Sequence, residues 1–156
     1  MLAAASLAGM TPVIWFRPPD ARAAVQQWLG DDLDLRPQPS GLLGARIAGA
    51  VAGAVLPAGW LALLRLSPGV EDVLSQAIAG LEEATYVIGP SSDGGCYLVG
   101  GRAPVFAALR ELASPGPGAL DAMRSGLGAA GHSWRECAVL RPLESVSDAR
   151  AARLLG

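Results

Sequence analysis

The sequence predicts an α/β fold with a mostly parallel sheet and helices on both faces, and two observations support this prediction. Short β-branched or aromatic runs alternate with longer segments of helical periodicity along most of the chain. Such alternation implies parallel strands that are joined by right-handed crossovers. The 156 residues, 51% of them apolar and 17% charged, supply a core of ordinary size. We therefore expect residues 1–156 to form a single domain.

The first half of the chain shows this alternation. Residues 2–10 are typical of the tail of a helix, and the β-branched and aromatic residues 12–16 (PVIWF) predict a buried strand. Asp20 is a candidate N-cap for a helix over residues 21–29. A short strand over residues 33–36 and a rigid loop over residues 37–41 then precede a helix that begins near Leu42.

The second half continues the pattern with an amphipathic helix over residues 70–83. Strands are expected over residues 85–88 and 96–99, helices over 104–112 and 118–130, a strand that ends with ECAVL at residue 140, and a helix over 148–155. Ligands of such sheets bind beyond the carboxyl ends of the strands. We therefore expect the site among the loops that follow strands, namely residues 36–44, 66–69, 89–95 and 140–147.

Residues 47–64 form an uncharged run of 18 residues, which matches the lower limit for a membrane-spanning helix. Half of the run is Ala and Gly, and Pro57-Ala58-Gly59 is a turn signal in its middle. We therefore expect two elements, a helix over residues 47–56 and a buried strand over residues 60–66, and no membrane contact. A membrane-associated protein is the alternative that this run leaves open.

The charged residues and cysteines exclude several classes of chemistry. The net charge of −2 gives the chain no electrostatic attraction to nucleic acid. One His and no Lys leave no material for a His-rich metal site or a lysine nucleophile. Cys96 and Cys137 lack the spacing of a zinc site or a disulfide framework. These features predict a reduced, cytoplasmic protein with two buried thiols.

The segment GPSSDGGCYLVG, residues 89–100, is the most distinctive in the chain. Asp93 follows a predicted strand and precedes Gly94 and Gly95, which allow the backbone to turn and to approach a ligand closely. A carboxylate in this position can hold a metal ion, accept a hydrogen bond from a sugar hydroxyl or orient a nucleophile. The alternative is that these three residues form a tight turn between two strands.

This segment closely resembles the GPxxDGGYYLIG signature of a bacterial family of glycosyltransferase-A-like proteins, which are described as nucleotide-diphospho-sugar transferases and in some members are linked to arsenosugar biosynthesis. Residues 38–47, QPSGLLGARI, resemble that family's QPxGDLGxRM. The resemblance implies a Rossmann-like sheet, a nucleotide-sugar donor and Mg²⁺ or Mn²⁺. It suggests Asp93 as the catalytic residue and a substrate pocket lined by residues of both segments: Gln38, Gly41, Gly44, Arg46, Gly94, Gly95 and Tyr97.

The chain also departs from this family at the positions that would hold a cation. Leu66 and Gly69 stand where the family's GSDCPDL has acids, and Val146 stands where its DVDTPEDL has the central one. The family's glycine-rich phosphate loop and first strand have no counterpart in this sequence. We therefore assign no metal-ligating residue and expect a truncated, degenerate member that is weak or inactive alone.

Two further expectations follow from the resemblance. Arg46 lies in the first turns of a helix and could contact a phosphate, although an exposed salt bridge is an alternative. The missing first strand would lie inside the family's sheet, so its absence either lets the neighbouring strands close up or exposes edges that pair with a second copy. A noncatalytic binding or oligomeric assembly module, for which exposed edges predict a homodimer, is therefore the alternative to a sugar-nucleotide transferase.

Overall fold

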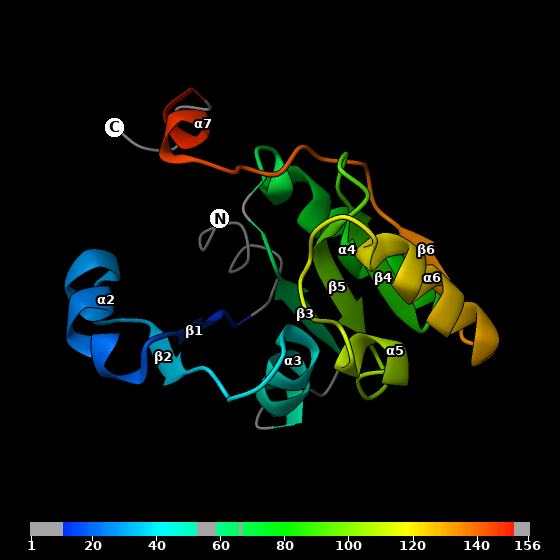
Figure 1. Cartoon of the computed structure of the whole chain (residues 1–156), viewed down its shortest axis with the longest axis horizontal. Coiled ribbons are helices and arrows are strands. Elements are labelled where there is room, and N and C mark those ends of the chain that lie inside the picture. The colour runs from blue at the N-terminus through cyan, green and yellow to red at the C-terminus, as the bar shows by residue number, and fades with distance from the viewer. Residues whose placement is uncertain (1–10, 53–58, 66, 152–156) are drawn as a thin grey trace.

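The computed structural model describes residues 11–52, 59–65 and 67–151 (Figure 1). Strands and helices alternate along these residues as the sequence predicts. The elements are β1 (Val13–Phe16), the 3-10 helix η1 (Pro19–Ala21), α2 (Arg22–Leu29), β2 (Asp34–Pro37), α3 (Leu43–Ala52), β3 (Trp60–Leu63), α4 (Val70–Glu83), β4 (Tyr86–Pro90), β5 (Cys96–Gly101), α5 (Ala107–Arg110), α6 (Ala119–Ala129), β6 (Trp134–Glu136) and α7 (Val146–Ala151).

The larger sheet of the described residues has the strand order β3-β5-β4-β6 and is mixed rather than mostly parallel. Strand β5 pairs antiparallel with β3 and with β4, whereas β4 and β6 pair in parallel. The reason is the short connection after β4, because a turn over residues 91–95 reverses the chain and leaves no room for a crossover helix. Strands β3, β4 and β6 therefore run in one direction, and their carboxyl ends meet at one edge.

Strands β1 and β2 form a separate parallel pair in the described part of the chain. Figure 1 shows this pair and α2 on one side of the molecule, with α3 between them and the larger sheet. Within the described residues, β1 pairs only with β2 and β3 pairs only with β5. Strands β1 and β3 therefore each keep one edge without a strand partner among the described residues.

Helices cover both faces of the larger sheet, as expected. On one face, Tyr86 and Ile88 of β4 pack with residues of α5 and α6. On the other face, Val87 packs with residues of α4. A β-bulge in β5 interrupts the alternation of its side chains between the two faces of the sheet. Gly89 pairs with Leu98 and Pro90 pairs with Cys96, so Tyr97 between them is the extra residue. Tyr97 and Leu98 consequently share the α4 face.

Several expected element boundaries are corrected. Asp20 is not an N-cap, since it lies inside η1 and α2 begins without a side-chain cap. The helix expected over residues 104–112 is a single turn, Ala107–Arg110, because breaker-rich sequence surrounds it. The strand expected to end at residue 140 is Trp134–Glu136, and Leu140 contributes an isolated bridge to Ser91.

Some expectations fall on residues that the structure does not describe. These are the helix over residues 2–10, the later part of the helix over 47–56, residue 66 of the strand over 60–66, and the end of the helix over 148–155. The uncharged run 47–64 nevertheless holds two elements as expected, the second part of α3, which begins earlier at Leu43, and the strand β3.

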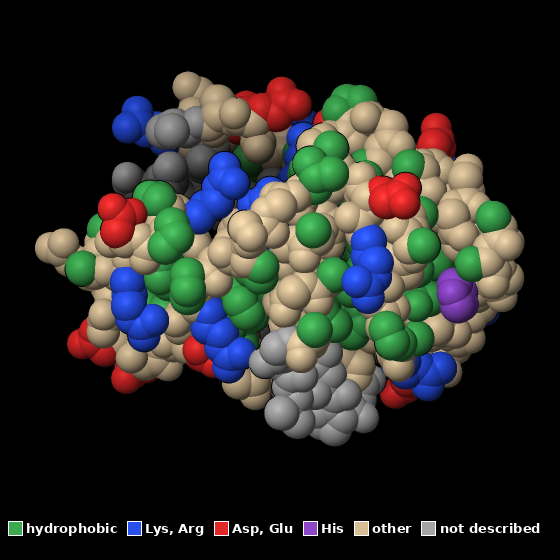
Figure 2. Space-filling model, turned by 60° about the horizontal axis from the view of Figure 1, so that its bottom comes forward, with side chains coloured by type: hydrophobic (Ala, Val, Ile, Leu, Met, Phe, Trp, Pro, Cys, Tyr) green, Lys and Arg blue, Asp and Glu red, His purple; other side chains and the backbone are tan. Residues whose placement is uncertain are grey.

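Among the described residues, no helix has the length and apolar character needed to cross a membrane. Figure 2 shows acidic and basic side chains both distributed over the face in view. This distribution agrees with the small net charge of −2.

Candidate functional site

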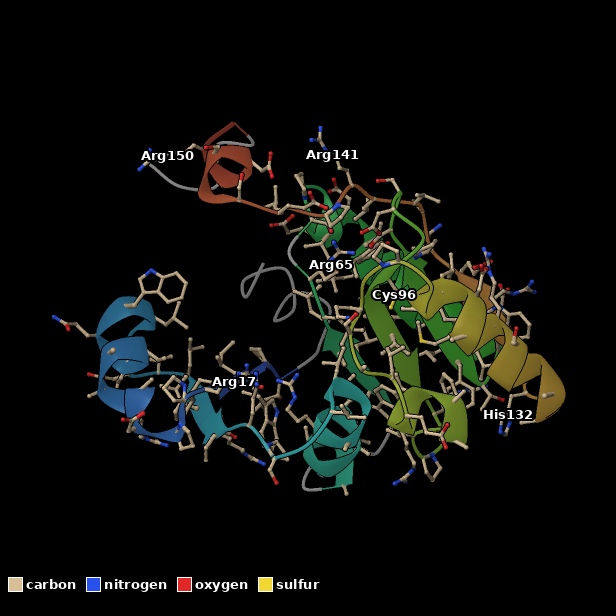
Figure 3. All side chains as sticks on the ribbon, in the orientation of Figure 1. Arg17, Arg65, Cys96, His132, Arg141 and Arg150 are labelled. Carbon is tan, nitrogen blue, oxygen red and sulfur yellow. The ribbon has the colours of Figure 1, made fainter. Side chains whose placement is uncertain are left out.

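Three charged side chains meet at the edge formed by the carboxyl ends of β3, β4 and β6. They are Arg65, Asp93 and Glu144, which belong to the segments that follow these three strands. Figure 3 labels Arg65 near the end of β3. Arg65 Nη1 lies 2.9 Å from Asp93 Oδ2, and Arg65 Nη2 lies 4.0 Å from Glu144 Oε1. Three of the four loops expected to carry a site, or the residues beside them, therefore converge here.

Asp93 lies in the tight turn between β4 and β5, so the structure contains the turn that the sequence left as an alternative. Arg65 Nη1 donates to both of its carboxylate oxygens, and the Gly95 N–H donates to Oδ1. Burial acts to raise the pKa of Asp93, but these hydrogen bonds and the charge of Arg65 outweigh it and hold the pKa below its ordinary value. Asp93 is therefore a carboxylate with an internal counter-ion.

Gly94 and Gly95 pack against the segment between α5 and α6. The Gly94 carbonyl accepts hydrogen bonds from the backbone N–H groups of Gly118 and Leu120 at the start of α6. A Cβ at Gly95 would lie 2.2 Å from the Pro115 carbonyl oxygen and 2.9 Å from Arg65 Nη1. The lack of a side chain at Gly95 thus allows Arg65 to approach the turn.

Tyr97 and Cys96 are completely buried below this edge. The Tyr97 hydroxyl donates to the Ala138 carbonyl. The backbone carbonyl of Tyr97 accepts hydrogen bonds from the N–H groups of Leu64 and, at 3.4 Å, Arg65. Tyr97 therefore fixes the backbone from which Arg65 projects. Burial raises the pKa of Cys96 to about 12, which leaves its thiol protonated and a poor nucleophile near neutral pH.

The second expected group of site residues lies around the start of α3. Gln38 Nε2 donates to the Trp15 carbonyl, and Gln38 Oε1 accepts from Arg46 Nη1. This contact differs from both the phosphate contact and the exposed salt bridge considered for Arg46. Gly41 adopts a φ of +106°, in the left-handed region. A Cβ at Gly44 would lie 1.8 Å from a backbone oxygen of α5, so this glycine permits close helix packing.

The two groups are attached to the same connecting segment after α5. The Gly44 N–H donates to the Leu112 carbonyl, and the Cys96 N–H donates to the Pro115 carbonyl. Three residues of extended chain reach at most about 11 Å. The QPSGLLGARI segment and the GPSSDGGCYLVG turn are therefore held on neighbouring parts of the molecule.

The acids at this edge do not suit a divalent cation. Asp93 is engaged by Arg65, and the Asp148 carboxylate accepts the N–H groups of Glu144 and Ser145 at the start of α7. Glu144 remains, with a side chain that is 70% exposed. No group of three His, Cys, Asp or Glu residues that could hold a metal occurs in the part of the chain that the structure describes. The donor set expected for Mg²⁺ or Mn²⁺ is therefore incomplete.

Sequence comparison identifies a family for this chain. A profile described as an uncharacterized protein conserved in bacteria, DUF2064, matches residues 1–113, which is more than half of the chain. The chain belongs to the DUF2064 family. No curated protein shows significant sequence similarity to this DUF2064 chain.

Structural comparison relates this DUF2064 chain to a crystal structure of a putative nucleotide-diphospho-sugar transferase from Desulfovibrio desulfuricans G20. The two share 19% sequence identity with a TM-score of 0.69, over 86% of this chain and 60% of that protein. The chain thus spans less than two thirds of the length of its structural relative. This likeness establishes a shared α/β fold.

Arg65 and Glu144 belong to this site but were not among the residues predicted for it. Arg65 directly follows the uncharged run over residues 47–64. The strand predicted over residues 60–66 included Arg65, whereas the structure ends β3 at Leu63, so no signal in the sequence indicated that this side chain lies at the ligand-binding edge.

Proposed function

We propose that this DUF2064 chain is a nucleotide-diphospho-sugar-binding domain of the glycosyltransferase-A-like type, with weak or no transfer activity by itself. The observation that supports it most directly is the position of the GPSSDGGCYLVG turn, whose Asp93 meets Arg65 at the carboxyl edge of the sheet. The fold likeness to a protein described as a nucleotide-diphospho-sugar transferase is in agreement. We further propose that the chain is a degenerate member of the type linked to arsenosugar biosynthesis and that it is located in the cytoplasm.

The chemistry of the edge suits a ligand that carries both phosphate and hydroxyl groups. A guanidinium binds phosphate oxygens through paired N–H groups, and a carboxylate accepts hydrogen bonds from sugar hydroxyls. Arg65 and Glu144 supply these two kinds of group on adjacent segments. A nucleotide sugar presents a diphosphate beside a sugar and therefore matches them.

Weak transfer activity follows from the acids that are missing or engaged. Breaking the bond between a sugar and a diphosphate builds negative charge on the leaving oxygens, and a bound cation or several fixed donors must stabilise that charge. Here the Asp93 carboxylate is already hydrogen-bonded to Arg65 and Gly95. One guanidinium then provides much less stabilisation than a complete cation site.

The test is isothermal titration of the purified chain with uridine, guanosine, adenosine and thymidine diphosphate sugars. We expect at least one to bind, and we expect Asp93→Ala to weaken this binding at least about tenfold, because the loss of its carboxylate releases Arg65. Asp121→Ala is the matched control, since that side chain is 86% exposed on α6. Circular dichroism checks the fold of both variants. Unchanged binding in Asp93→Ala would contradict this assignment.

A second candidate function is an assembly module, and the divided sheet supports it. The outer edges of β1 and β3 have no strand partner among the described residues, and such edges pair readily with another chain. We expect a homodimer if this candidate is correct. Sedimentation equilibrium over a concentration series measures this directly, and a monomer at every concentration would exclude a homodimer.

A further inference from the structure

The guanidinium of Arg65 is held from one side only. Nη1 donates to the Asp93 carboxylate and, at 3.5 Å, to the Pro115 carbonyl. The Arg65 side chain is 16% exposed, so the group is largely withdrawn from water. Its direction is therefore fixed by contacts that involve a single nitrogen.

The other two nitrogens of this guanidinium keep their donors for a ligand. Nε and Nη2 carry three N–H groups between them and make no hydrogen bond with the described residues. Glu144 Oε1 lies 4.0 Å from Nη2, which is beyond hydrogen-bond distance. The Nε and Nη2 edge of a guanidinium is suited to two oxygens of one phosphate.

Glu144 is a weak and replaceable neighbour for this edge. Its side chain is 70% exposed, and exposed ion pairs at such a separation contribute little to stability. An arriving phosphate can therefore displace it at small cost. Removing its charge should favour an anion at Arg65, because the phosphate then meets one negative charge fewer.

The charge that a bound cation would otherwise provide is thus already present in the chain. Asp93, the acid at the centre of the GPSSDGGCYLVG turn, has Arg65 as its counter-ion. Gly95 leaves space for this arrangement, since a Cβ there would lie 2.9 Å from Nη1. The pair is therefore built into the turn.

From this geometry we propose that Arg65 binds a phosphate or diphosphate group through its Nε and Nη2 edge, without a divalent cation. Asp93 acts as the positioning residue that holds the guanidinium, and Glu144 is the exchangeable counter-ion. The identity of the anion as the diphosphate of a nucleotide sugar rests on the function proposed above. Binding of an anion at Arg65 without a cation does not depend on that proposed function.

The experiment is isothermal titration of the chain with inorganic pyrophosphate and with nucleoside-diphosphate sugars, first in EDTA and then in excess Mn²⁺. We expect pyrophosphate to bind equally well in both conditions. Arg65→Gln should weaken it at least about tenfold, which corresponds to about 1.4 kcal/mol. Arg135→Gln is the matched control, because it removes the same charge from an exposed pair with Glu83 on the sheet margin and should leave binding unchanged.

Two further variants keep the test decisive if Arg65→Gln fails to fold. Arg65→Lys retains the positive charge but loses the paired donors, so it should bind pyrophosphate more weakly than the unaltered chain. Glu144→Gln alters an exposed side chain and should bind pyrophosphate about two- to fivefold more tightly.

The outcomes separate this inference from the proposed function. Binding that requires Mn²⁺, or that survives in Arg65→Gln and Arg65→Lys, would overturn the role of Arg65 and leave sugar-nucleotide binding standing. Pyrophosphate binding through Arg65 in EDTA, with no nucleotide sugar bound more tightly than pyrophosphate, would support the inference and contradict the proposed function. Failure of every probe to bind would reject both.

Discussion

At the scale of single residues, the site depends on how closely the turn after β4 packs against its surroundings. Asp93, Gly95 and Arg65 form one unit, in which the carboxylate binds both the guanidinium and the Gly95 N–H. Neither Asp93 nor Arg65 is fully buried, with side chains that are 23% and 16% exposed. Such a pair is strong enough to fix geometry and open enough to meet a ligand.

Gly95→Ala is expected to destabilise the protein. The new Cβ would lie 2.2 Å from the Pro115 carbonyl oxygen, so backbone must move, at a cost of about 1–3 kcal/mol in the free energy of unfolding. Gly128→Ala is the control, because Gly128 is exposed in α6 with no atom within 4 Å of the added methyl group. It should stabilise by about 0.5–1 kcal/mol. Urea denaturation measures both, and equal effects would refute the packing argument.

The two buried thiols predict a loss of stability at high pH. Burial raises the pKa of Cys96 to about 12 and that of Cys137 to about 11, whereas an unfolded chain has thiols near about 8.5. Above about pH 8.5 the unfolded state therefore loses protons that the folded state keeps, and stability falls by up to about 1.4 kcal/mol per pH unit for each thiol. Below that pH the thiols are protonated in both states, and no stability is lost through them.

Urea denaturation between about pH 8.5 and 10, below the ordinary range of tyrosine, measures this slope. The variant with Cys96→Ala and Cys137→Ala should show a much flatter profile over the same range. A slope that is identical with and without the thiols would contradict the prediction.

At the scale of elements, the molecule divides into a well-buried sheet and a thinly packed β1–α2–β2 unit. All five residues of β4 and all six of β5 are buried. In contrast, α2 has no buried residue, and Trp28 on it is 76% exposed. Phe16 and Leu35 are the buried side chains of β1 and β2. The burial of apolar surface, which supplies most of the stability, is therefore concentrated in the larger sheet.

Native-state hydrogen exchange should reveal this difference. Amides of α2 are expected to exchange through local opening, with protection well below that of β4 amides, which should exchange through global unfolding. Leu35→Ala should speed exchange in β1, α2 and β2 while that of β4 changes little. Equal protection in α2 and β4 would show that the two parts unfold together.

At the scale of the whole molecule, the carboxyl ends of β3, β4 and β6 collect residues from distant parts of the chain, as in other α/β sheets. Arg65 and Asp93 are 28 residues apart, and Glu144 follows much later. Two carboxylates and one guanidinium from these three segments therefore lie together at this edge.

Removal or addition of divalent cations should accordingly leave the unliganded protein unchanged. We expect the same Tm in EDTA and in excess Mn²⁺, measured by differential scanning calorimetry. A cation held with useful affinity would stabilise the folded state by mass action. A rise in Tm above about 3 °C, equivalent to about 1 kcal/mol, would indicate a metal site that the donor set does not suggest.

The sequence predicted most of the elements because their patterns are local. The helical spacing of residues 70–83 and the β-branched runs before Gly89 reflect which side chains each element must bury, and the structure confirms α4 and β4 there. Sequence patterns failed to predict the position at which one helix begins. Asp20 looks like an N-cap in sequence, but the chain forms a 3-10 turn through it.

The sequence by itself determined an α/β fold and the position of the Asp93 turn, since these depend on residue types and short spacings. Only the tertiary structure decided that β5 runs antiparallel, that β1 and β2 stand apart from the larger sheet, and that Arg65 neutralises Asp93. Strand direction and ion pairing across 28 residues arise from how distant segments pack, and no local pattern records that packing.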